Sequence, residues 1–583
     1  MKIYAADLET TGLDFTTDSI ICLGYYSPKD FGVLTDKTQI KQWLLDNQDS
    51  FLIWQNGKFD QKFIKKEFDL WVRNDFDTLL AASLLPEKPK SRALESLAAF
   101  YLGEPPWKEA ALKQDIDTIK DYCQKDCQIT YKLFEVEANL LRQANQDAFF
   151  HKYLMPLSSL LAQLEYSGIP INLNKLDWIL FNNQNPNNLL KQITDLQTHL
   201  YTAYYPIISE YELKKLEQYK RPPCQKTIDT KIRFNFNSPD QKLWLLKNKL
   251  GLPCKDYKGK ETVGKEVISE YIGEHPIIAE LLSLSKITTQ YEYLSSYKTL
   301  SRQGKLHTTF NLDVTRTGRL SSKEPNLQNV DTGKSIRSIF CAEPGKKLVI
   351  GDLSQIEARL AAHFSEDPLL ISTFAEGIDF YSVLACALLG LTEDPKTLKV
   401  ENPDARNFGK LVGLSLLYGI GNIKLINEIK INTGKKFSYR EVEQFKTSFF
   451  NRFGGLRSLR KQAYAGALQN GYVQTLFGRK VFLDAKDAEH VAVNRIIQPS
   501  ASDLCAFSQF WVLREAKEHG FKVEPLLLVH DEAIYQVEEK DAEGFAVLLK
   551  TVMEHGYKKY TDIQLKVPLG CDVFSGDDWS CKN

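Results

Sequence analysis

The chain has 583 residues, of which 43% are hydrophobic, and its 74 basic and 74 acidic side chains leave no formal net charge. At roughly 100–200 residues per domain, this length predicts several structural units with sizeable cores. A neutral total by itself argues against a nucleic-acid binder, because neutralising phosphates needs Lys and Arg, although it can hide local basic surfaces.

The N-terminus enters a predicted strand at once and carries neither a signal-peptide core nor a transit segment. No apolar run is long enough to span a bilayer, so no membrane partner is expected. Cys123 and Cys127 are the closest cysteines, but no matching His or Cys pair completes a zinc site. All ten cysteines are expected to be reduced thiols in the cytoplasm, or in an organelle matrix if a transit segment has been removed.

The secondary-structure pattern changes twice along the chain. Residues 1 to about 135 have an α/β pattern, and a single long helical pattern runs from residue 130 to 166, where Ser-Gly-Ile-Pro breaks it. Residues 175–300 are mostly helical, and strands return only beyond about residue 340. The predicted strands lie at 2–7, 51–56, 347–353 and 525–537.

Four carboxylates and a tyrosine make the N-terminal part a candidate metal-dependent hydrolase. Strand alternation places Asp7 and Glu9 on one face, where two carboxylates repel each other unless a divalent cation lies between them. Asp60 follows the next predicted strand, and Tyr122 and Asp126 lie one helical turn apart. This set suits a two-metal hydrolase in which Tyr122 helps to orient the attacking water. Each element alone is more often an ordinary surface or turn residue.

Together and in this order, these residues resemble the DEDD-type 3′-5′ exonucleases of the variant with Tyr in the last motif. The segments DTLL at 77–80 and LESLAAFYLG at 94–103 look like that family's connecting segments. The resemblance covers about residues 1–135 and implies an RNase H-like fold. It also implies that Mg²⁺ or Mn²⁺ is held by Asp7, Glu9, Asp60 and Asp126.

A second set of acids lies near the C-terminus. Asp352 ends one apolar strand, and His530-Asp531-Glu532 forms the turn of a hairpin-like run. If these strands are neighbours, Asp352 and Asp531 converge on one metal pair, which would activate a primer 3′-hydroxyl and neutralise charge on a triphosphate. The alternative is two unrelated acids at strand ends.

Between these acids, four residues recur at every fourth position and form one stripe along a helix. They are Arg406, Lys410, Leu414 and Tyr418. Two cations followed by Leu and Tyr suit a triphosphate at one end and a sugar and base at the other. The alternative is an amphipathic helix with a charged edge. Three glycines in the segment argue against a purely structural helix, since each costs about 0.5–1 kcal/mol relative to Ala.

These motifs and their flanks resemble the family A DNA polymerases, the relatives of bacterial DNA polymerase I. In chain order they are FNFNS at 234–238, HP at 275–276, TGRLSSKEPNLQN at 317–329, DLSQIEAR at 352–359, RNFGKLVGLSLLYG at 406–419 and HDE at 530–532. The first two look like the thumb, the third like the primer–template contact motif, the fourth and last like the palm motifs, and the fifth like the fingers helix.

The resemblance implies a role for each residue. Asp352 and Asp531 would bind the catalytic metals. Arg406 and Lys410 would hold the triphosphate, and Glu357 would block a ribose 2′-hydroxyl. The full nucleotide set is Arg406, Lys410, Leu414, Tyr418, Glu357 and Gln355. The primer–template set is Arg319, Asn326, Gln328, Arg359, Asn494, Gln498 and His530.

Three residues depart from the family pattern. Leu414 stands where Phe or Tyr is usual, Tyr381 where a phosphate-contacting His is common, and His490 where an Arg is common. The chain also begins at the exonuclease segment, without a 5′-nuclease segment. This makes it resemble a phage or organellar replicative enzyme, which would work in the host cytoplasm or nucleoid if phage-encoded.

The sequence therefore predicts a multidomain α/β plus α+β protein that extends a DNA primer with dNTPs on a DNA template and uses two divalent ions per active site. The predicted domains are an exonuclease at 1–135, a linker helix and thumb at 136–340, and palm and fingers at 341–583, with the fingers at about 370–485. Residues 201–233, an insertion rich in Tyr and Lys, suit DNA contact, docking of a processivity or replisome protein, or plain helical decoration.

Two rival functions are weighed against this prediction. One is a related RNA polymerase, against which Glu357 and the intact exonuclease residues argue. The other is a nuclease or structural DNA-binding module with an inactive polymerase half. The joint presence of Asp352, Lys410 and Asp531 argues against it.

Overall fold

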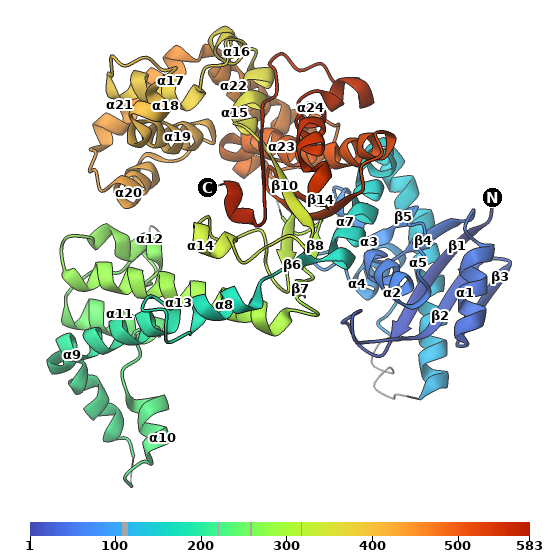
Figure 1. The fold of residues 1–583 in the computed structure, drawn as a ribbon, viewed down its shortest axis with the longest axis horizontal. Helices are drawn as coiled ribbons and strands as arrows, with labels where there is room; N and C mark the ends of the chain where they lie inside the picture. The colour runs from blue at the N-terminus through green and yellow to red at the C-terminus, as the bar shows by residue number, and fades with distance from the viewer. Residues whose placement is uncertain (108–114, 220, 257–258, 316–317, 583) are drawn as a thin grey trace.

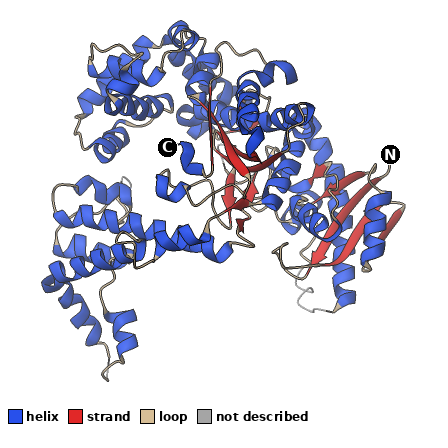
Figure 2. Ribbon diagram, in the orientation of Figure 1, coloured by secondary structure: helices blue, strands red, loops and turns tan. Residues whose placement is uncertain are grey.

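The computed structural model of the chain describes residues 1–107, 115–219, 221–256, 259–315 and 318–582. Two β-sheets organise these residues, one near the N-terminus and one in the C-terminal half (Figures 1 and 2). One group of helices lies below the C-terminal sheet at the left of Figure 1, and a second group lies above it.

The N-terminal unit consists of a five-stranded sheet, ordered β3-β2-β1-β4-β5, and the helices packed on it. Its strands are β1 (Ile3–Thr10), β2 (Ile20–Ser27), β3 (Asp30–Leu34), β4 (Phe51–Trp54) and β5 (Phe76–Asp77). Its helices are α1 (Lys37–Asp46), α2 (Lys58–Phe68), α3 (Thr78–Ser83), α4 (Leu94–Leu102) and α5 (Ile116–Gln143). The first three strands pair antiparallel, whereas β4 adds to β1 in parallel. The long helix α5 packs on β1 and β2 and so brings its side chains beside those of β1.

The single helix predicted from 130 to 166 is wrong, because the structure divides it. Helix α5 ends at Gln143, and a short helix α6 (Asp147–Phe149) and a π-helical segment lead into α7 (Met155–Ser167). Asn145 has a φ of 52°, a left-handed conformation that a right-handed helix cannot continue. The Gln146 side chain donates to the Gly478 carbonyl at 3.0 Å and accepts from the Lys480 amide at 2.8 Å. These two hydrogen bonds connect the helix break to the C-terminal half.

The helical arm, formed by the elements α8 to α13, has a hydrophobic core of its own. Its helices are α8 (Leu173–Leu180), α9 (Leu189–Leu216), α10 (Gln225–Thr227), α11 (Pro239–Leu243), α12 (Lys265–Ile268) and α13 (Pro276–Leu300). Phe234 and Phe236 are buried in this core, and Tyr201, Tyr204 and Tyr211 of α9 pack against it. The described part of the 201–233 insertion therefore contributes to the arm's packing.

The C-terminal sheet has the antiparallel order β13-β14-β10-β15. Its strands are β10 (Lys346–Leu353), β13 (Val523–Val529), β14 (Glu532–Glu538) and β15 (Cys571–Gly576). The helices α23 (Ala485–Glu518) and α24 (Ala542–Tyr560) pack against this sheet. A Cβ at Gly351 would lie 2.5 Å from the Met553 Sδ, so the glycine lets α24 pack directly on β10. The predicted hairpin at 525–537 is present as β13 and β14.

The upper helices in Figure 1 surround α19 (Pro403–Leu417), which carries the predicted stripe. They are α15 (Ile356–Ser365), α16 (Pro368–Ala375), α17 (Phe380–Leu389), α18 (Leu398–Glu401), α20 (Asn422–Thr433), α21 (Tyr439–Arg452) and α22 (Gly454–Asn470). A Cβ at Gly409 would lie 2.3 Å from the Tyr381 carbonyl oxygen of α17. At Gly413 a Cβ would lie 2.3 Å from the Leu384 side chain. These two glycines therefore have a packing role. This corrects the argument from the sequence that glycines in this segment are evidence against a purely structural helix.

A buried ion cluster joins the N-terminal unit to the C-terminal half. Glu165 of α7 accepts from Lys58 and Lys62 of α2, the latter at 2.7 Å. Its carboxylate also accepts the Phe310 amide at 2.8 Å, on the small strand β8 (Thr309–Asn311). The side chain of Glu165 is 1% exposed, and the two lysines hold the pKa of its carboxyl below the usual value against the opposing effect of burial.

We expect Glu165→Ala to lower the free energy of unfolding by about 3–5 kcal/mol, because it removes the carboxylate that two buried lysines and one buried amide share. Of the two lysines, Lys58 keeps a second acceptor, the Phe310 carbonyl. Calorimetric thermal unfolding measures this loss. The matched control is Glu518→Ala, which breaks an exposed helical pair with Arg514 and should cost less than about 1 kcal/mol. Equal losses in both variants would contradict a structural role for the cluster.

Two candidate active sites

A cavity of about 550 Å³ brings together all five residues predicted for the exonuclease. They are Asp7, Glu9, Asp60, Tyr122 and Asp126. Asp7 and Glu9 project from β1, Asp60 from the first turn of α2, and Tyr122 and Asp126 from α5. Strand alternation aligns Asp7 with Glu9, and helical spacing aligns Tyr122 with Asp126. The two pairs lie side by side because α5 packs against β1.

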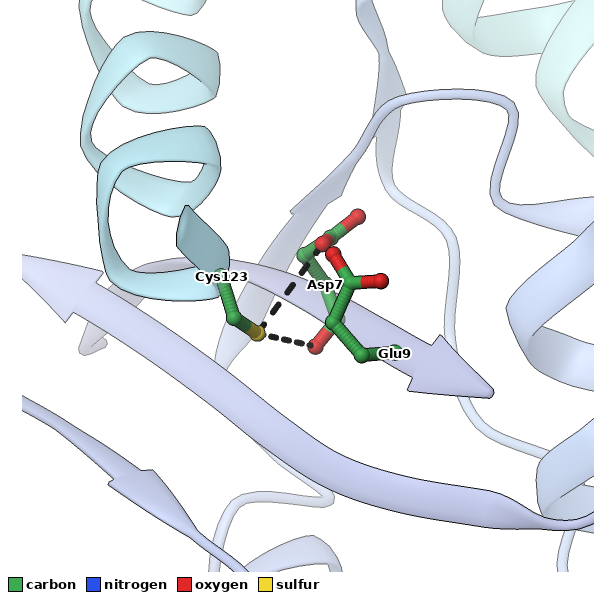
Figure 3. A group of neighbouring side chains, drawn as sticks. All are labelled: Asp7, Glu9 and Cys123. Carbon is green, nitrogen blue, oxygen red and sulfur yellow. Dashed lines mark hydrogen bonds between the residues drawn. The ribbon is translucent and has the colours of Figure 1, made fainter. Parts of the chain in front are cut away.

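Local hydrogen bonds fix this carboxylate cluster. The Leu8 amide donates to Asp60 at 3.1 Å, and the Trp107 indole donates to Asp126 at 2.8 Å. Figure 3 shows Asp7 and Glu9 beside Cys123 of α5, whose thiol donates to the Asp7 carbonyl at 3.6 Å. Neither Trp107 nor Cys123 was singled out from the sequence as a site residue.

The cluster fits a divalent cation. Ligand atoms of Asp7, Glu9 and Cys123 all lie within 4.8 Å of one another. Burial, reinforced by the charges of Asp77 and Glu9, raises the pKa of Asp60 well above its usual value. Carboxylate oxygens crowded in this way are ligands that Mg²⁺ and Mn²⁺ prefer. Burial and the nearby carboxylates also raise the pKa of Tyr122, which therefore keeps its phenolic proton.

A second cavity, of about 350 Å³, gathers Asp352 and Asp531 with three of the four stripe residues, which belong to α19. Asp352 lies near the end of β10, and Asp531 lies in the turn between β13 and β14. The Leu353 amide donates to the Asp531 carbonyl at 3.1 Å, which keeps the two segments together. Burial and the charge of Asp352 raise the pKa of Asp531 to about 6, so a cation between the two carboxylates would relieve a real repulsion.

Three of the four predicted stripe residues line this second cavity, and Tyr418 does not. Arg406, Lys410 and Leu414 line it. The Arg406 guanidinium pairs with Asp379 at 3.0 Å and lies 5.0 Å from the ring centre of Tyr381. Arg406 is thereby held in place from α17.

Glu357 of α15 links three predicted residues. Its carboxylate accepts from the Tyr418 hydroxyl and pairs with the Arg319 guanidinium. Gln355 lies at the start of the same helix, where its side-chain oxygen accepts the Phe380 amide at 3.1 Å. These contacts place Glu357 at the junction of α15, α19 and the segment that carries Arg319.

The residues predicted to contact DNA fall into two groups. Gln498, Arg319 and His530 line a small cavity beside Asp531, and Asn494 lies one turn before Gln498 on α23. Burial lowers the pKa of His530, so its ring is neutral near pH 7.

The side chains of the second group bond backbone atoms. Gln328 is buried, accepts the His530 amide at 3.3 Å and donates to the Leu528 carbonyl. Asn326 accepts the Gln328 amide at 3.0 Å, and Arg359 donates to the Ser354 carbonyl at 2.8 Å. Their contact with DNA stays a prediction, and residue 317 of that motif lies outside the described residues.

Sequence analysis missed several residues of the two sites. Asp572 of β15 pairs in register with Asp352 and lines the second cavity together with Lys399. Lys582 bonds Asp352 at 2.8 Å. In the first cavity, Lys323 of the small strand β9 (Ser321–Lys323) was missed. The sequence pattern predicted no strand at Asp572, and none of these four residues carried a signal in the sequence.

Comparison with known proteins decides the family. The family model for DNA polymerase family A matches residues 208–581, and the model for a 3′-5′ exonuclease matches residues 1–141. The chain belongs to DNA polymerase family A. Family A polymerases and their exonucleases use divalent metal ions. The predicted multidomain α/β plus α+β fold is confirmed.

Similar proteins include DNA polymerase I of Caldicellulosiruptor bescii, which is 30% identical over 526 residues, or 87% of this chain and 55% of that protein. The thermostable DNA polymerase I of Thermus filiformis is 35% identical over 365 residues, or 59% of this chain and 42% of that protein. This family A chain spans about half the length of the curated relatives it matches.

Among solved structures, the fold resembles the POL domain of Pol1 from M. smegmatis in complex with DNA primer-template and dNTP. The TM-score is 0.81 at 24% identity, over 99% of this chain and 96% of that one. At this identity the likeness supports the fold. Within the described residues, no helix is both long and apolar enough to cross a membrane.

Proposed function

We propose that this family A chain is a template-directed DNA polymerase that extends a DNA primer with dNTPs and proofreads with a 3′-5′ exonuclease. One observation carries the proposal: the chain holds two separate carboxylate cavities. One of them combines Asp352 and Asp531 with the cations Arg406 and Lys410, and the other contains acids and Tyr122. A primer-extension gel with and without dNTPs tests both activities, since extension reports the polymerase and shortening reports the exonuclease.

Each cavity suits two Mg²⁺ or Mn²⁺ ions. Asp352 and Asp531 would hold them in the polymerase cavity, and the four acids of the N-terminal unit would hold them in the exonuclease cavity. Such ions neutralise phosphate charge and activate the attacking oxygen, which is the primer 3′-hydroxyl in one cavity and water in the other.

The polymerase side chains position the nucleotide. Arg406, fixed by Asp379 and Tyr381, and Lys410, one turn further along α19, present positive charge to the triphosphate. Leu414 faces the sugar from the next turn, and the Glu357 carboxylate fills the space that a 2′-hydroxyl would need. In the exonuclease cavity, Tyr122 keeps its proton and donates it in a hydrogen bond that orients the water.

Primer–template DNA would be contacted by Arg319, Gln498 and His530, which flank Asp531. A neutral His530 can donate to or accept from a base edge. Three further points stay predictions. They are a processivity protein bound at residues 201–233, a phage or organellar origin, and a location in the cytoplasm, host nucleoid or organelle matrix.

The first prediction separates the two activities. Asp7→Ala combined with Glu9→Ala should abolish shortening of a single-stranded primer from its 3′ end, because it removes two acids of one cavity, while extension stays largely intact. A 3′-labelled primer assay measures the shortening. Asp46→Ala with Asp49→Ala, two acids outside both cavities, should leave both rates unchanged. Wild-type shortening by the Asp7 and Glu9 variant would refute the exonuclease assignment.

The second prediction concerns sugar choice. Glu357→Ala should raise ribonucleotide relative to deoxyribonucleotide incorporation by about tenfold or more, or ~1.4 kcal/mol, because it opens the space beside the sugar. Overall synthesis should also slow, because Arg319 and Tyr418 lose their shared acceptor. Glu357→Gln keeps the bulk and should keep the discrimination. Single-nucleotide kinetics measure the ratio, and equal ratios in all three proteins would remove Glu357 from this role.

The third prediction concerns Leu414, which lines the polymerase cavity between Lys410 and Tyr418. Leu offers the sugar neither a ring nor a polar atom, and the smaller apolar area that it buries costs ~1 kcal/mol of binding free energy. The wild type should therefore discriminate against dideoxynucleotides. Leu414→Tyr should relax this discrimination, since its hydroxyl can stand in for a missing 3′-hydroxyl, and Leu414→Phe should tighten nucleotide binding without relaxing it.

Dideoxy-to-deoxy incorporation ratios for the three proteins decide this prediction. The alternative is that Leu414 only packs inside the helix group, in which case a larger side chain overpacks the core. Identical ratios together with lowered melting temperatures would support that alternative and contradict the sugar contact.

A further inference from the structure

The last described residue of the chain reaches into the polymerase cavity's acid cluster. Lys582 lies at the end of the 3₁₀ segment Trp579–Lys582. Its ammonium lies 2.8 Å from the Asp352 Oδ2 and 2.7 Å from the Glu532 Oε2. Asp352 and Glu532 face each other in register across β10 and β14, so one cation bridges the two strands. With a side chain 19% exposed, Lys582 is held in a partly buried position where its charge is weakly screened.

Glu532 has other partners and does not depend on Lys582. The buried Trp579 donates its indole N–H to the other oxygen of Glu532. The Arg337 guanidinium lies 3.7 Å from Glu532 and 4.6 Å from the Trp579 ring centre. The Trp579 amide donates to the Phe340 carbonyl at 2.9 Å, which anchors the segment. The contact that Lys582 adds on its own is therefore the one with Asp352.

Resting on the proposed polymerase function, we propose that Lys582 is a built-in counter-ion that competes with the divalent cation for Asp352. An ammonium 2.8 Å from a carboxylate oxygen points its proton at the lone pair that a metal ion at about 2.0–2.1 Å would use. The two positive charges cannot share that oxygen without strong repulsion. A metal ion that takes the Asp352 Oδ2 must displace the ammonium from that oxygen.

Glu532 makes this displacement feasible. Because Lys582 already bonds the Glu532 carboxylate at 2.7 Å, it can leave Asp352 and keep one acceptor. Lys582 thereby lowers the affinity of the cavity for a metal ion alone. A nucleotide that brings its own phosphate ligands gives the metal extra binding energy to overcome this competition, so metal and nucleotide would bind together.

The test measures Mn²⁺ binding by electron paramagnetic resonance on the full chain without nucleotide. The parent protein carries Asp7→Ala and Glu9→Ala, which weaken the exonuclease cavity as a metal site. Lys582→Met keeps the aliphatic stem and removes the charge. It should bind Mn²⁺ about fivefold more tightly, or ~1 kcal/mol, which is the scale of a partly exposed ion pair. Lys582→Gln provides a second neutral variant should the first fail to fold.

Two control variants isolate the effect of the charge at this place. Lys347→Met removes a lysine from the same strand as Asp352, where it pairs with Asp577 at 2.7 Å and Glu539 at 3.1 Å, and it should leave Mn²⁺ affinity unchanged. Lys582→Arg keeps the charge and should keep the parent's affinity.

The outcomes are distinct. Tighter Mn²⁺ binding in each neutral variant that folds, but not in Lys347→Met, supports the inference. Unchanged affinity overturns it, and so does weaker binding, which would mean that Lys582 holds the carboxylates in place for the metal. Loss of primer extension in the parent protein would refute the proposed function instead, and the Mn²⁺ comparison would still decide the role of Lys582.

Discussion

Repulsion between carboxylates fixed on a rigid sheet is the constraint on which the rest of the polymerase half depends. The pairing of β10 with both neighbours places Glu532 on one side of Asp352 and Asp572 on the other. Asp531 lies next to Glu532, in the turn of the hairpin. Strands in register cannot move these acids apart. The surrounding groups therefore have to offset the charge, through the Trp579 indole, the Lys582 ammonium and the Ser354 hydroxyl that donates to Asp572. The same arrangement makes a divalent cation favourable there.

The two cavities are separate, but residues of one chain segment line both of them. The segment between β8 and β9 contributes Asp313 and Val314 to the wall of the exonuclease cavity, and the same segment carries Arg319, which pairs with Glu357 in the polymerase cavity. Where this segment lines the exonuclease cavity, an ion pair between Arg92 and Asp313 at 2.6 Å holds it in place. Under the proposed function, Arg319 would contact primer–template DNA, while Asp313 and Val314 of the same segment line the exonuclease cavity.

Local rules explain what the sequence could predict. Strand alternation placed Asp7 with Glu9, and helical spacing placed Tyr122 with Asp126. The features that escaped prediction depend on contacts between distant segments. The helix break near Asn145 is fixed by bonds from Gln146 to residues more than 330 positions away. Lys582 gave no signal because a short terminal segment has no periodicity that indicates its neighbours.

Under the proposed function, Tyr381 in place of the family's usual histidine would change which side chains attract the triphosphate. Tyr381 is 4% exposed and lies under the Arg406 guanidinium, which Asp379 holds from the same helix. A ring in that place contributes no positive charge to a triphosphate, and it acts through Arg406 by fixing where the guanidinium points. Under the proposed function, electrostatic attraction for the triphosphate would come from the lysine and arginine side chains that line the described cavity, which are Arg319, Lys399, Arg406 and Lys410. Because Arg319 and Arg406 are already neutralised in part by Glu357 and Asp379, Lys410 and Lys399 would supply a larger share of this attraction than they would beside a charged histidine.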